Sequence, residues 1–206
     1  LSILPESVVD MKSLTLFLTL LFVALVCVAM GTGIPTTALY IVLAAIAAPA
    51  VIQLGVPPLA AHLFILYYGV LADLTPPVCI AAYAAAGIAG ADPFKTGNTA
   101  FRLGLAKATV PFVFAYSPAM LIMVDGFTWA DFFITTSTCA LGVLLLGIGT
   151  TGYAFTHMGL GAKAVLVISA LLMISPNIQM TLAGAALALP VILWNWHKSS
   201  RIAQTT

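Results

Sequence analysis

The stretch GTGIPTT, residues 31–37, interrupts an apolar run that extends from Ser13 to Gln53 without a charged side chain. Two glycines and a proline in seven residues break a helix, because glycine has excess backbone freedom and proline lacks an N–H donor. The arms on either side, 13–30 and 36–53, approach the ~20 apolar residues that a helix needs to cross a bilayer. The sequence therefore predicts two apolar helices joined at 31–37.

Two arrangements of these arms are open. In one, two full spans are joined by a loop at the membrane surface. In the other, 13–53 is a re-entrant helical hairpin whose tip, near 31–37, stops inside the protein. Surface turns are usually rich in residues such as Asp and Asn, and the tip contains neither. We therefore favour the re-entrant hairpin.

A second break, DLTPP at 73–77, lies within the next apolar run, 57–90. Pro76 disfavours a helical conformation at Thr75, and neither proline can donate a backbone hydrogen bond. Carbonyl groups one turn earlier are therefore expected to be unpaired and available to a cation. The run 57–90 is predicted to be one broken transmembrane helix. Two such breaks at mid-segment are typical of ligand half-sites in secondary transporters.

The composition places the whole chain in a membrane. Of its 206 residues, 62% are hydrophobic and only 6% are charged, whereas a soluble domain carries about 25% charged residues. The mean hydropathy is +1.15. The fold class is therefore predicted to be an all-α polytopic membrane protein. The net charge of +1, without a basic run, gives no indication of a nucleic-acid partner.

The rest of the chain is organised around the two breaks. A polar lead-in, 1–12, precedes the hairpin. A polar connection, 91–107, with room for a short amphipathic helix, follows the broken helix, and its basic residues place it on the cytoplasmic side. Residues 108–206 are predicted to hold the C-terminal transmembrane helices, beginning with a span over 109–124, and a basic tail. The chain opens on Leu1 without a signal-peptide pattern, so we expect it to be the C-terminal portion of a longer polypeptide.

The first break has the features of a small-ligand site. Gly31 and Gly33 allow a ligand to approach the backbone closely. Pro35 fits the first turn of the second arm, which leaves Thr36 and Thr37 at the N-terminus of a helix. Free N–H groups and the positive end of the helix dipole suit a carboxylate there, and the hydroxyls suit a small cation such as sodium. A plain helix corner capped by threonine is the alternative.

The second break carries Asp73, the only charged side chain between Lys12 and Asp92. An acidic group at membrane depth is a functional candidate. It can bind a cation or hold a proton, and a solvated carboxylate or a helix cap is the structural alternative. Thr75 adds a hydroxyl and a carbonyl. His62 lies eleven residues before Asp73, about three helical turns, so both are predicted on one face. A proton pathway through both, or a histidine hydrogen-bonded to a neighbouring helix, fits this spacing.

No catalytic constellation such as GxSxG or HExxH occurs, and the chain is not expected to be an enzyme. A membrane enzyme acting on lipids or isoprenoids would need clustered acids or a histidine-rich metal site, which the sequence lacks. An assembly subunit without a site would tolerate changes at Thr36 and Thr75. The three cysteines, Cys27, Cys79 and Cys139, lie in apolar segments and are expected to be small buried residues.

At both breaks the sequence resembles a known family. GTGIPTTALYI, residues 31–41, is similar to the GMGxPTTAxYI signature of TRAP transporter permeases, specifically the TAXI-associated type in which small and large membrane subunits are fused. The run from Ala60 to Val78 resembles the AAHLFxxYxGxxxxxTPPV block of the large, DctM-like region, and DP at 92–93 and TG at 96–97 continue it. Thr32 stands where Met is commoner, and Cys79 where Ala is commoner.

The resemblance implies an elevator-type transporter built from inverted repeats, of which this chain holds the second. It further implies sodium-coupled uptake of organic acids (carboxylates) across the cell inner membrane. The implied partners are a periplasmic substrate-binding protein, the N-terminal remainder of the permease and membrane lipids, with sodium as coupling ion and no cofactor. By carry-over, the substrate-binding residues are Gly33, Pro35, Thr36, Thr37 and Thr75, and the sodium half-site comprises Gly31, Gly33, Thr36, Asp73, Thr75 and Pro76.

Overall fold

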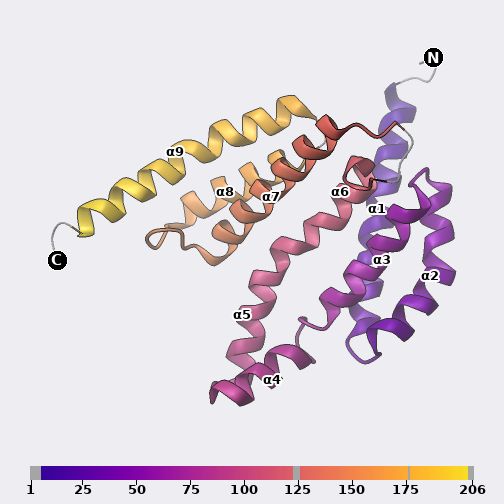
Figure 1. Cartoon of the computed structure of the whole chain (residues 1–206), viewed down its shortest axis with the longest axis horizontal. Coiled ribbons are helices and arrows are strands. Elements are labelled where there is room, and N and C mark those ends of the chain that lie inside the picture. Colours follow the sequence, from indigo (N-terminus) through magenta and orange to yellow (C-terminus); the bar gives the residue numbers. More distant parts are fainter. Residues whose placement is uncertain (1–5, 123–125, 176, 204–206) are drawn as a thin grey trace. The chain divides into compact units, whose positions relative to one another are not determined.

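The computed structural model describes residues 6–122, 126–175 and 177–203, and the side chains of 14–122, 126–175 and 177–200. In these ranges the chain is helical, without a β-strand (Figure 1). The α-helices are α1 (Glu6–Gly31), α2 (Thr36–Gln53), α3 (Pro58–Ala72), α4 (Ile80–Ala89), α5 (Pro93–Leu105), α6 (Val110–Tyr116), α7 (Trp129–Thr151), α8 (Leu160–Ile174) and α9 (Ile178–Ala203), and the short 3-10 helices are η1 (Ala106–Thr109) and η2 (Pro118–Met120).

The chain forms two compact units. The first comprises Leu1–Asn98 and Phe114–Pro118, and the second comprises Thr99–Val113 and Ala119–Thr206. Helix α5 begins in the first unit and ends in the second, so it connects them along the chain. Each unit is described by itself.

In the first unit, α3 packs against both α1 and α2, which also contact each other (Figure 1). Leu20, Cys27, Leu39 and Phe64, contributed by these three helices, are almost inaccessible to solvent. Their apolar side chains fill the space between the three helices. A polar side chain buried there without a hydrogen-bond partner would destabilise the fold. This packing fixes the ends of the helices where the two predicted breaks lie.

The observed helix ends fall at both breaks. Helix α1 ends at Gly31 and α2 begins at Thr36, while α3 ends at Ala72 and α4 begins at Ile80. Each of α1 and α2 contains an 18-residue stretch long and apolar enough to cross a membrane. Whether the tip between them lies inside the bilayer therefore stays a prediction.

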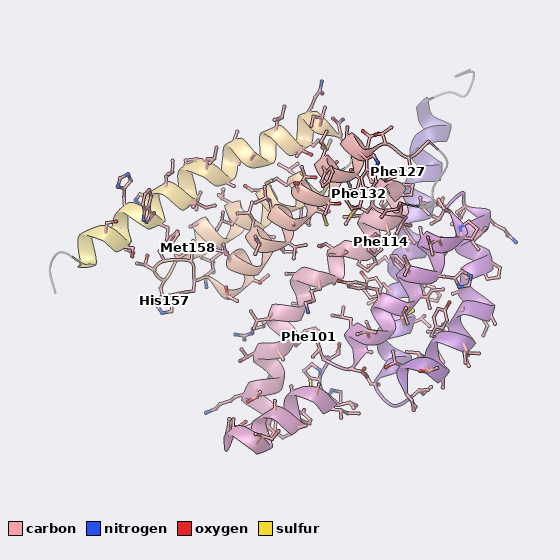
Figure 2. All side chains as sticks on the ribbon, viewed as in Figure 1. Phe101, Phe114, Phe127, Phe132, His157 and Met158 are labelled. Atoms are coloured by element: carbon pink, nitrogen blue, oxygen red, sulfur yellow. The ribbon has the colours of Figure 1, made fainter. Side chains whose placement is uncertain are left out.

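In the second unit, α8 packs against α7 and α9. Leu146, Leu166 and Met173 belong to its apolar core. Asn195 of α9 is fully buried, and its amide accepts hydrogen bonds from the N–H groups of Phe155 and Thr156 and donates two to Thr156. The amide thus fastens the loop between α7 and α8, in which His157 and Met158 lie (Figure 2).

The prediction of one span over 109–124 is wrong for the part that the structure describes. Helix α6 covers only 110–116, and 3-10 turns lie on both sides of it. Pro118 explains the early end, because the residue before a proline is pushed out of the helical region. Residues 123–125 lie outside the described ranges.

Four helices of the described chain have the length and apolar composition of a membrane span, within α1, α2, α7 and α9, and α3, α4 and α8 are shorter apolar helices. Only 22–28% of each span is buried inside the protein. Large apolar side chains such as Phe22 (68% exposed) and Ile46 (71% exposed) therefore point outward. Apolar patches of this extent mark a surface that contacts lipid or another protein. The prediction of an all-α protein is confirmed, and its surface suits a membrane.

Candidate functional site

The two breaks meet at one hydrogen bond. The Thr36 hydroxyl, in the first turn of α2, donates to Oδ2 of Asp73, at the end of α3, over 3.0 Å. Gly31 makes this approach possible: a Cβ at Gly31 would lie 2.3 Å from the Cβ of Ala72, a distance that no side chain tolerates. Glycine at the end of α1 therefore lets the first break sit directly against the end of α3.

A cavity of about 500 Å³ opens beside this contact. Among the described residues that line it, Asp73 is the one ionisable side chain, and the hydroxyl-bearing residues Thr32 and Thr36 are the other polar ones. The side chains of the lining thus offer one carboxyl group and two hydroxyls. The lining residues are Gly31, Thr32, Gly33, Ile34, Pro35, Thr36, Asp73, Val78 and Ile80.

The first break presents the N-terminus of α2 to this cavity. Pro35 occupies the N-cap position with φ −55° and ψ 137°, and no side chain caps the helix there. The Thr32 hydroxyl donates to the carbonyl of Ala29 instead, and the Thr36 hydroxyl to Asp73. The threonine-capped corner is therefore not the arrangement found. The first N–H groups of a helix lack intrahelical acceptors and lie at the positive end of its dipole.

The second break departs in part from the prediction of unpaired carbonyls. The Ala72 carbonyl accepts from the Thr75 N–H at 2.9 Å. The Leu71 carbonyl accepts from the Leu74 N–H and from the Thr75 hydroxyl, and the Leu74 carbonyl accepts from Sγ of Cys79. These three carbonyls are bonded within the protein. The chain tightens into short turns after α3, which gives the Ala72 carbonyl, four residues before Pro76, another donor. For the Asp73 carbonyl, four residues before Pro77, the absence of a helical donor stays a prediction.

The predicted site residues divide into two groups. Gly31, Gly33, Pro35, Thr36 and Asp73 line the cavity. Of the remaining predicted residues, all in the described part of the chain, none belongs to that lining: Thr37 is exposed, and Thr75 and Pro76 are half-buried in the second break.

Sequence reasoning missed four lining residues. Thr32 and Ile34 lie in the tip stretch itself, so treating the whole stretch as cavity wall would have found them. Val78 and Ile80 are apolar residues that follow the second break. Nothing in their type or spacing signals a cavity wall.

His62 contacts a neighbouring helix. Its Nδ1 lies 3.0 Å from the hydroxyl of Tyr40 on α2, and the two rings meet edge to face at 6.1 Å. This pair joins α2 and α3 at a second place, separate from the bond between Thr36 and Asp73. The hydrogen-bonded histidine, rather than a contact with Asp73, is the arrangement that the structure shows.

The cysteines are free and buried, which confirms the prediction for Cys27, Cys79 and Cys139. Within the described residues, no group of three or more His, Cys, Asp or Glu side chains gathers at metal-binding distance. A cation here would instead be bound by the oxygens of Asp73 and Thr36, which are hard ligands of the kind that alkali and alkaline-earth ions prefer.

Comparison with known proteins gives one finding. Residues 4–129 match the family model described as "Tripartite ATP-independent periplasmic transporter, DctM component". This range is 126 of the 206 residues and includes both breaks and every residue of the cavity lining. Among curated proteins and among solved structures, the comparison finds no match.

Proposed function

The chain belongs to the family of the DctM component, the large membrane component of tripartite ATP-independent periplasmic transporters, and on that premise we propose that it forms the second inverted repeat of a sodium-coupled organic-acid transporter. This is a family of transporters rather than enzymes, and the chain is a multi-pass membrane protein. The observation that carries the proposal is the hydrogen bond from Thr36 to Asp73, which joins the two breaks at one cavity.

Asp73 is the proposed centre of the sodium half-site. A carboxylate among apolar helices is costly unless a proton or a cation neutralises it. The Thr36 hydroxyl, 3.0 Å away, supplies a second oxygen ligand. Gly31 lets the first break approach the end of α3, and the exposed Gly33 leaves its backbone accessible. Thr75 and Pro76 would support the half-site through the turns of the second break. Sodium is a substrate of the cycle, bound and released with the organic acid.

The N-terminus of α2 is the proposed contact for the organic acid. Because the lining residues that the structure describes include no basic side chain, the positive features that they leave to a carboxylate are the helix dipole, the free N–H groups of α2 and the bound sodium. Gly33, Pro35 and Thr36 would form this wall, with Thr37 at its edge. A site built in this way binds the anion well only after sodium, which is the basis of coupling.

The family also suggests the partners and the location. We propose that the chain lies in the cell inner membrane, that a periplasmic binding protein delivers the substrate, and that the remainder of the native permease supplies the other half-site. Membrane lipids would cover the exposed apolar faces of α1 and α2.

Uptake by the complete native transporter, reconstituted in liposomes with its binding protein, tests the proposal. A panel of labelled mono- and dicarboxylates would be offered under an inward sodium gradient, a potassium gradient or a proton gradient. We expect accumulation under the sodium gradient alone. Accumulation under the proton gradient without sodium would contradict the proposal and favour proton coupling through Asp73 and His62.

A further inference from the structure

Tyr83 connects α4 back to the second break. Its hydroxyl donates to the carbonyl of Pro77 over 2.8 Å. Its own N–H donates to the Cys79 carbonyl over 2.9 Å, so the side chain folds back along the first turn of α4. Pro77 has no N–H, and its carbonyl is therefore the one backbone group through which the surrounding protein can hold it by a conventional hydrogen bond.

Cys79 lies at the junction between the break and α4. It adopts a left-handed conformation with φ 33°, which non-glycine residues rarely occupy. Its Sγ donates to the Leu74 carbonyl at 3.2 Å, and its side chain is fully buried. Such a conformation persists only where the surroundings hold it in place. The residues next to it, Val78 and Ile80, line the cavity.

The first turns of α5 cover both Tyr83 and Cys79. A Cβ added to Gly97 would lie 2.9 Å from Cε1 of Tyr83 and 3.2 Å from Sγ of Cys79. The ring of Phe94, one turn earlier, lies 5.9 Å from the ring of Tyr83. Asp92 fixes where α5 begins, because its Oδ1 accepts from the Lys95 N–H at 2.8 Å. Helix α5 can therefore pack against Tyr83 and Cys79 because Gly97 has no side chain.

We propose that Tyr83 is a positioning residue for the transport site and that Phe94 and Gly97 of α5 keep it in position. Tyr83, Cys79, Phe94 and Gly97 are together called the α5 latch. When α5 is seated, the latch holds the Pro77 carbonyl and Cys79, and thereby places Val78, Ile80 and the preceding Asp73 around the cavity. The effect on transport rests on the proposed function, whereas the latch itself does not.

Cys79 reports directly on the latch, because its thiol is buried beneath Gly97. The complete native transporter, with its other cysteines replaced, would be labelled in membranes with a membrane-permeant maleimide. If a substitution lowers the free energy needed to open the latch by ~1.4 kcal/mol, maleimide labels Cys79 about tenfold faster. We expect a change of that size for Gly97→Ala and a smaller one for Tyr83→Phe, which keeps the ring. Gly87→Ala, on α4 with open space around it, is the matched control and should leave labelling unchanged.

A second measurement separates positioning from general stability. In Tyr83→Phe, the half-saturating sodium concentration for uptake should rise about threefold to tenfold while the maximal rate changes by less than about twofold, since one hydrogen bond that orders the site is lost. Labelling of Cys79 that is unchanged in both variants would overturn the latch. Faster labelling with unaltered sodium dependence would overturn the positioning role. Wild-type uptake that ignores sodium would overturn the proposed function alone, and the labelling would still decide the latch.

Discussion

Both breaks of the first unit end one helix and begin another, but the backbone groups around them are bonded differently. The first, at 31–37, leaves the N-terminus of α2 uncapped and turned toward the cavity. At the second, 73–77, the carbonyls of Leu71, Ala72 and Leu74 are bonded within the protein, and Asp73 gives the cavity a carboxyl group. The difference indicates a division of roles: the first break offers backbone N–H groups, and the second offers a carboxylate on a braced backbone.

The chemistry of the two stretches explains this difference. In the first break the Thr32 and Thr36 hydroxyls donate to the Ala29 carbonyl and to Asp73, and no side chain caps the N-terminus of α2. The second break is followed by donors at Cys79 and Tyr83 and contains Thr75, so its carbonyls find partners nearby. Changes in each break should therefore have unequal consequences.

Removing the charge of the second break should have the largest effect. Asp73→Asn keeps the shape but deletes the one ionisable group among the described lining residues. A lost charge-assisted contact of ~2–3 kcal/mol corresponds to roughly a hundredfold lower sodium-driven uptake. Initial uptake rates across a sodium series measure it. Asp131→Asn, in the first turn of α7 and outside the cavity lining, is the control and should retain sodium dependence. If Asp73→Asn keeps the sodium dependence of uptake but loses its pH dependence, Asp73 binds a proton rather than sodium.

Thr36→Val tests the contribution of the first break. The change preserves shape and removes the hydroxyl that bonds Asp73, so the half-saturating sodium concentration should rise about tenfold, equivalent to ~1.4 kcal/mol. Thr36→Ser retains the hydroxyl and should stay close to wild type. If Val and Ser variants behave alike, the hydroxyl has no part in cation binding.

Gly31→Ala tests how the two breaks are brought together. The added Cβ would collide with that of Ala72, and such overpacking costs roughly 1–3 kcal/mol. The purified transporter should unfold at a lower temperature, as followed by a thermal scan of tryptophan fluorescence. Gly33→Ala adds the same methyl group where nothing lies within 4 Å and serves as the control. Equal melting curves for the two variants would show that the close packing at Gly31 is unimportant for stability.

Thr75→Val should have the smallest effect. Its hydroxyl bonds the Leu71 carbonyl, already paired with the Leu74 N–H, so the loss should be ~0.5–1 kcal/mol of stability. The half-saturating sodium concentration should stay within about twofold, a change too small to represent the loss of a cation ligand. A shift as large as that of Thr36→Val would mean that the second break contributes its hydroxyl directly, and the proposed division of roles would fail.

Some of this site was accessible from the sequence. The positions of both breaks follow from glycine and proline, whose effects act on their immediate neighbours. Asp73 stood out because no other charge lies near it in the chain. The prediction of an unpaired carbonyl was wrong for Ala72, because a proline rule says which donor is missing, not which other donor replaces it. The prediction of a span over 109–124 was wrong because hydropathy does not include the effect of Pro118 on the backbone of the residue before it.

The sequence by itself determined the membrane setting, the helical class, the two breaks and the family signature, because composition and local backbone chemistry depend on residues close together in the chain. Only the tertiary structure decided that Thr36 meets Asp73, that His62 meets Tyr40 and that Gly97 seats α5 on Tyr83. Those contacts join different helices. They depend on how closely the helix backbones approach, and the packing of whole side-chain surfaces sets that distance.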